Sequence, residues 1–215
     1  ESRYASIGAA TPDGTIFCHS GTIPPQGVNI ADRKWFQEML AKREFIQGNY
    51  VVGRIIGAPI LVFAYPSMEN GEVKAVVFAA LNLAWFSRVL EPTHEKIYAA
   101  AYLFHQDGIV LARSYDWDAA IGRRIEDKRL LDALGAGKEG PVLAKGLTGI
   151  ENLYVLKRLK AVGLDSLYFA VSVDTNALMF EAFSELKTML ILFALIAALA
   201  YFAAWQGSAI AILRP

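Results

Sequence analysis

The sequence predicts an α+β protein: two tandem units, each an antiparallel sheet with flanking helices, followed by a C-terminal transmembrane helix. Asp-Gly pairs at residues 13–14 and 107–108 each separate two apolar, strand-like runs, which is a strong hairpin signal. These two pairs lie 94 residues apart. Two further pairs of landmarks, Gly57 with Gly149 and Asn82 with Asp174, each lie 92 residues apart, which indicates a duplicated unit rather than chance spacing of common hairpins.

Composition excludes several classes of protein. The 215 residues carry 21 basic and 21 acidic side chains, and this zero net charge argues against nucleic-acid binding, which needs a basic field. A single cysteine, Cys18, excludes an internal disulfide framework, and three scattered histidines make a metal site unexpected. The sequence has no serine-nucleophile elbow, phosphate loop or His-Glu metal motif. We therefore expect no enzyme activity and no cofactor in this chain.

The elements of the first unit follow from local patterns. Asp32 is expected to cap a helix from Arg33 to about Arg43. Apolar side chains at helical spacing give this helix a buried face, namely Trp35, Phe36, Met39 and Leu40. After the hairpin, strands are expected at Tyr50–Ile56, Pro59–Tyr65 and Lys74–Leu83.

The second unit is expected to repeat this order more briefly. A short helix is expected at Lys128–Leu134, ending at Gly135, and a strand at Ser166–Val173. A Glu-Pro-Thr break at residues 91–93 separates the units, so we place the first at residues 1–91 and the second at residues 92–175. Long antiparallel strands after a short helix favour a sheet with helices on one side.

The C-terminal segment predicts a membrane anchor. Residues 188–205 are almost wholly apolar, and a helix of about 20 such residues spans a bilayer. Residues 176–205 contain neither glycine nor proline, so they are expected to form one rod about 45 Å long. We divide this segment into a connecting helix at 176–187, a transmembrane helix at 188–210 and the start of a cytoplasmic linker at 211–215. Residues 1–187 are placed outside the cytoplasm, and the chain is expected to be a fragment of a longer inner-membrane protein.

Four motifs of the first unit resemble the ligand-binding half of double Cache sensor domains. They are Asn-Ile-Ala-Asp-Arg-Lys-Trp-Phe at residues 29–36, Gly-Asn-Tyr-Val-Val-Gly-Arg at 48–54, Pro-Ile-Leu-Val-Phe-Ala-Tyr-Pro at 59–66 and Val-Val-Phe-Ala-Ala-Leu-Asn-Leu at 76–83. The resemblance implies two PAS-like units in the extracytoplasmic sensor of a histidine kinase, diguanylate cyclase or chemoreceptor. It also implies a homodimer, and a small-molecule ligand bound in the first, membrane-distal unit.

The same resemblance suggests which residues bind the ligand. Arg33 and Trp35 match the arginine and tryptophan that the family places over its pocket. A guanidinium in the first helical turn can hold a carboxylate, although a solvated arginine at a helix end is the alternative. The remaining candidates are pocket walls or possible hydrogen-bond donors, each with a plain structural alternative, namely Phe36, Tyr50, Arg54, Tyr65 and Asn82.

Two departures from the family pattern bear on the ligand. Amino-acid-binding members have a tyrosine where Phe36 stands and an aspartate where Asn82 stands. Asn82 brings no negative charge for an ammonium group. With Arg33 unopposed, and Arg54 as a possible second anchor, we expect a small organic anion rather than an α-amino acid. The alternative function is a structural, dimerising or partner-binding module with no pocket, whereas a sensor predicts a cavity of a few hundred Å³.

Overall fold

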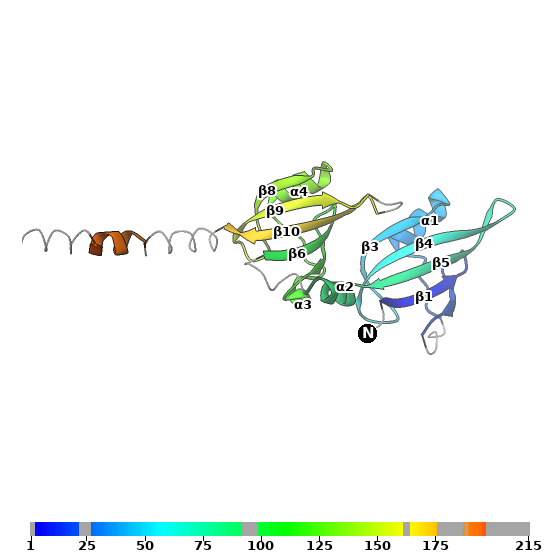
Figure 1. The fold of residues 1–215 in the computed structure, drawn as a ribbon. Coiled ribbons are helices and arrows are strands. Elements are labelled where there is room, and N and C mark those ends of the chain that lie inside the picture. Colours follow the sequence, from blue (N-terminus) through cyan, green and yellow to red (C-terminus); the bar gives the residue numbers. More distant parts are fainter. Residues whose placement is uncertain are drawn as a thin grey trace, which may run out of the picture. The chain divides into compact units, whose positions relative to one another are not determined.

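The computed structural model describes residues 3–21, 27–91, 99–160, 164–175, 187 and 189–196. Its first sheet has five antiparallel strands in the order β2-β1-β5-β4-β3 (Figure 1). The strands are β1 (Tyr4–Ala10), β2 (Ile16–His19), β3 (Ile46–Val52), β4 (Pro59–Glu69) and β5 (Glu72–Asn82). Helix α1 (Lys34–Lys42) lies between β2 and β3 in sequence, and α2 (Leu83–Leu90) follows β5 directly.

The second sheet repeats this topology with the order β7-β6-β10-β9-β8. Its strands are β6 (Ala99–His105), β7 (Val110–Arg113), β8 (Gly140–Lys145), β9 (Glu151–Arg158) and β10 (Leu167–Asp174), and its helices are α3 (Trp117–Ala120) and α4 (Lys128–Gly135). Gly57 and Gly149 occupy matching loops, β3–β4 and β8–β9, and both have a positive φ, 67° and 77°. The two tandem α+β units predicted from the sequence are therefore present.

Several elements differ from the expected ones. The strand expected at Tyr50–Ile56 begins earlier and ends at Val52, because the chain turns at residues 54–56 before Gly57. Asp32 does not cap α1: the N-cap residue is Arg33, which makes no side-chain capping hydrogen bond. The expected strand to Leu83 ends at Asn82, where α2 begins.

Three apolar clusters stabilise the described part of the chain. The expected stripe of α1 packs on the first sheet, where Trp35, Phe36 and Met39 are buried and Leu40 is partly buried. The second cluster lies between its sheet and α4, around Tyr102, Phe104, Tyr154 and Tyr168. The third contains residues of both units, including Leu61 of β4 and Leu83 of α2 from the first and Leu103, Leu111 and Leu167 from the second.

The C-terminal segment is described only in part. Residue 187 and residues 189–196 are helical, and the large apolar side chains of the latter stretch are more than half exposed, from 53% to 72%. In the part of the chain that the structure describes, no helix is both long enough and apolar enough to cross a membrane. Most of the expected connecting helix (176–187), transmembrane helix (188–210) and linker (211–215) lies outside the described residues.

Candidate functional site

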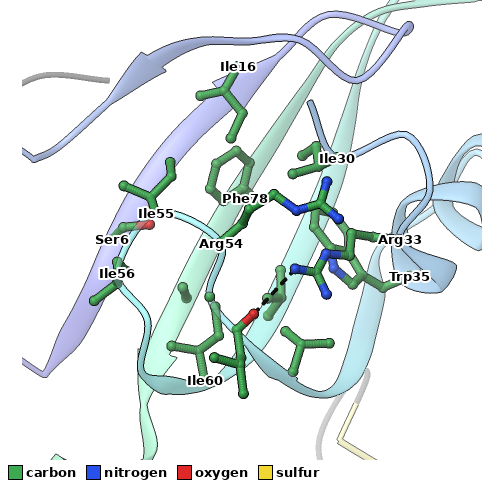
Figure 2. A pocket seen from close by; sticks show the side chains of 15 residues that line it. Ser6, Ile16, Ile30, Arg33, Trp35, Arg54, Ile55, Ile56, Ile60 and Phe78 are labelled. Atoms are coloured by element: carbon green, nitrogen blue, oxygen red, sulfur yellow. Dashed lines mark hydrogen bonds between the residues drawn. The ribbon is translucent and has the colours of Figure 1, made fainter. Parts of the chain in front are cut away.

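A pocket opens on the helix-covered face of the first sheet, beside the start of α1. Its walls come from all five strands, from Arg33 and Trp35 at the start of α1, from Ile30, and from the loop at residues 53–56. The walls are mainly aliphatic or aromatic: Ile16, Ile30, Trp35, Val51, Ile55, Ile56, Ile60, Val62 and Phe78. Figure 2 shows the guanidinium groups of Arg33 and Arg54 among these apolar side chains. The cavity volume is about 50 Å³, which is smaller than the few hundred Å³ expected.

Arg33 brings a positive charge to the end of α1 where backbone amides are unpaired. Its backbone is extended (φ −73°, ψ 128°), and the first turn of α1 contains no acidic residue. The guanidinium Nη2 donates a hydrogen bond to the Val52 carbonyl oxygen at 3.3 Å (Figure 2). Among the described residues it forms no ion pair. Because the helix dipole also favours negative charge at this end, the position suits an anion.

Arg54, the possible second anchor, is already paired with an acidic residue. Its Nη1 and Nη2 donate to the two carboxylate oxygens of Asp32 at 3.0 and 2.8 Å, and Nη1 also donates to the Asn29 carbonyl. The bidentate contact is the main reason that the pKa of Asp32 lies below its ordinary value. Asp32 is thus held by a residue 22 positions away, which explains why it does not cap α1.

The other sequence candidates lie in different surroundings. Trp35 is buried, lines the pocket and contacts Phe36 edge-to-face at 5.7 Å, whereas Phe36 is fully buried in the core and does not reach the pocket. Tyr65 is 61% exposed, away from the pocket. Tyr50 packs in the apolar cluster shared by both sheets. It lies so close to Gly122 that a Cβ added to Gly122 would be 2.5 Å from the Tyr50 ring.

Asn82 has a structural task at the end of β5. Its Oδ1 accepts a hydrogen bond from the Trp85 backbone N–H at 3.2 Å, so it caps α2. Of the seven candidate residues, the structure therefore brings Arg33, Trp35 and Arg54 together at one pocket. Among the described residues, no group of histidine, cysteine and acidic side chains could hold a metal ion.

Sequence reasoning missed the isoleucine walls of the pocket. Ile55 and Ile56 were assigned to a strand, but they lie in a loop bounded by Gly53 and Gly57 that closes the cavity. Ile16 comes from a segment without a ligand-binding motif, whereas Ile30 lies within the motif at residues 29–36 but is not one of the candidate residues. Two adjacent isoleucines between glycines were the available signal, because apolar side chains in a turn usually cover something.

No family model and no curated protein matches this sequence, but solved structures do. The extracellular domain of the putative histidine kinase rpHK1S-Z16 superimposes with a TM-score of 0.68 at 18% identity, covering 80% of this chain and 71% of that chain. The ligand-binding domain of the Pseudomonas aeruginosa PAO1 amino acid chemoreceptor PctB, in complex with L-Gln, gives a TM-score of 0.62 at 20% identity, covering 81% of this chain and 69% of that chain.

The ligand-binding domain of the Pseudomonas fluorescens chemoreceptor CtaA, in complex with L-isoleucine, gives a TM-score of 0.60 at 15% identity, with 85% and 72% covered. The first of the three is an extracellular domain, and the other two are ligand-binding domains of chemoreceptors. The chain thus has the fold of these extracellular and ligand-binding domains, which agrees with the two tandem units that the resemblance implied.

Proposed function

We propose that this chain is the extracytoplasmic sensing domain of a membrane receptor, and that its first unit binds a small organic anion. The observation that carries the proposal is the apolar pocket with Arg33 at its edge. The guanidinium there is bonded only to a backbone carbonyl among the described residues, so a carboxylate can add to it without displacing an acid.

The pocket favours a short aliphatic monocarboxylate over an amino acid. Isoleucine, valine and aromatic side chains suit an alkyl tail, and a volume of about 50 Å³ suits few carbon atoms. None of the described residues lining the pocket is acidic, so an ammonium group would be buried without a counter-charge. PctB and CtaA bind amino acids, but here Asn82 caps α2 and Asp32 is held by Arg54.

The proposal extends to the membrane and to signal transfer. Residues 188–210 would cross the inner membrane as one helix, and the exposed apolar side chains of residues 189–196 support this assignment. Ligand binding would shift the second unit and, through it, this helix in a homodimer. The output module is then a kinase, a cyclase or a chemoreceptor signalling domain.

Isothermal titration calorimetry on the full chain in detergent micelles tests the ligand class. We expect propionate to bind with one site per chain, and L-alanine, which differs by an ammonium group, to bind at least tenfold more weakly at this site. Arg33→Ala should abolish propionate binding, whereas Asp32→Asn should strengthen it severalfold, because Arg54 is then no longer neutralised.

Arg43→Ala is the matched control. Arg43 lies at the other end of α1 and also donates from Nη1 to a backbone carbonyl, that of Gly71, at 3.0 Å. Its loss should leave propionate binding unchanged. Equal losses in the two variants would refute a specific role for Arg33. Absence of binding by any small carboxylate would instead favour the alternative function, a ligand-free structural or partner-binding module, with which the small cavity is also compatible.

A further inference from the structure

The second sheet carries polar side chains at the place where the first sheet has its pocket. Tyr102 pairs with Arg113 across β6 and β7, so both side chains lie on the same face. Strand β10 alternates, and it places Ser172 and Asp174 on that face too, opposite Tyr154 and Asn152 of β9. One end of the face, beyond the core around Phe104 and Tyr168, is therefore polar.

Arg113 is the unusual residue of this group. It is only 8% exposed, and among the described residues its Nε atom is buried without a hydrogen-bond partner. Its guanidinium lies 4.0 Å from the ring centre of Tyr115 and 5.4 Å from that of Tyr102. Ring faces stabilise the cation, but they cannot accept the in-plane N–H bonds that a carboxylate accepts. A buried arginine with an unused donor indicates a missing acceptor.

A cavity of about 180 Å³ lies beside this guanidinium. Tyr102, Arg113, Asn152 and Ser172 line it, and so do two acidic residues, Asp116 and Asp174. Asp116 is exposed at the start of α3, and its carboxylate makes no capping bond there. Burial is the main cause that raises the pKa of Tyr102, so its hydroxyl remains a neutral donor at physiological pH.

The two cavities correspond in position. Ile60 and Ala80 line the first, and Asn152 and Ser172, which hold the same places in β9 and β10, line the second. The loop that contains Gly57 borders the first cavity, and the loop that contains Gly149 borders the second, because residues 147, 148 and 150 line that cavity. Duplication has thus produced two hollows on one framework, the first apolar and the second polar with charges of both signs.

We propose that the second unit binds a small zwitterion, whose carboxylate contacts Arg113 and whose ammonium group lies toward Asp116. A simple anion would meet Arg113 but also the two aspartates of the cavity, and a simple amine would leave Arg113 without its acceptor. A ligand with both charges satisfies both sides. This site is separate from the pocket of the proposed function and does not depend on it.

The test uses the full chain carrying Arg33→Ala, which removes the proposed site of the first unit. Three probes of matched size are titrated by calorimetry: L-alanine, propionate and propylamine. We expect L-alanine to bind with one site per chain, and the other two probes to bind at least tenfold more weakly. Arg113→Met should weaken L-alanine binding at least tenfold and Asp116→Asn severalfold. Arg124→Met is the control, because Arg124 donates to the Asp107 carbonyl at 2.8 Å, outside this cavity.

Each other outcome overturns the inference. L-alanine binding that survives Arg113→Met lies elsewhere in the chain, and a lack of saturable L-alanine binding means that there is no such site. Propionate binding as tightly as L-alanine would assign a plain anion site. Circular dichroism shows whether Arg113→Met still folds. If it does not, Asp116→Asn, whose side chain is exposed, and Ser172→Ala decide by the same titration.

Discussion

Replacing Asn82 with alanine separates a structural role from a ligand-binding role at one residue. Asn82 Oδ1 accepts from the Trp85 N–H at 3.2 Å and begins α2, an eight-residue helix with no acidic residue in its first turn. Loss of such a cap costs about 1 kcal/mol. For a chain of this size that corresponds to a fall in melting temperature of about 2–4 °C. Asn82→Asp keeps an acceptor and adds a charge that the helix dipole favours, so it should retain or raise stability.

The assay is urea denaturation of the full chain, followed by circular dichroism, with propionate titrations on the same variants. We expect Asn82→Ala to lower the midpoint without changing its slope, and to bind propionate as the unchanged chain does. Asn82→Asp should restore the midpoint. If Asn82→Ala has unchanged stability but loses the ligand, the amide contacts the ligand and the capping argument is wrong.

Two further predictions concern the second sheet. Arg129 and the Lys145 amide hold the pKa of Asp127, the N-cap residue of α4, well below its ordinary value. The ionised Asp127 carboxylate therefore contributes fully to stability above about pH 4, and this contribution is lost as the pH falls further. We expect Asp127→Asn to reduce the drop in urea midpoint between pH 5 and pH 2. Gly122→Ala combines a positive φ of 82° with an approach of 2.5 Å to the ring of Tyr50. Gly122→Ala should lower the free energy of unfolding by more than the roughly 1–2 kcal/mol of backbone strain alone. Gly149→Ala measures that strain alone, because φ is 77° there and the space around the new Cβ is open.

The sequence predicted those parts of the fold that depend on neighbouring residues. The two Asp-Gly turns, the apolar face of α1 and the repeat spacing are local or periodic signals, and the structure confirms each. The two turns lie at corresponding hairpins because the whole strand order is repeated. The start of α2 was missed because its apolar run after Asn82 can be interpreted equally as the end of a strand.

The candidate site was less predictable because its charges are paired across the chain. Asp32 is suited to capping by its sequence position, but Arg54, 22 residues later, takes its carboxylate. Nothing local distinguishes Arg54, which pairs with an aspartate, from Arg33, which among the described residues bonds only to a backbone carbonyl. Arg113 also attracts no attention in the sequence, since it simply ends an apolar run. Only strand register places its guanidinium beside Tyr102 and a cavity.

The apolar cluster shared by both sheets has a consequence for expression of parts of this chain. One cluster contains Leu61 of the first sheet, Leu83 of α2, and Leu103 and Leu111 of the second sheet, and all four side chains are almost completely inaccessible to water. Burial of each such side chain stabilises the fold by about 2 kcal/mol. Cutting the chain near residue 91 would leave this surface bare on both halves, so two separately produced halves should aggregate or reassociate. We therefore expect that the repeat visible in the sequence does not mark two independently folding domains.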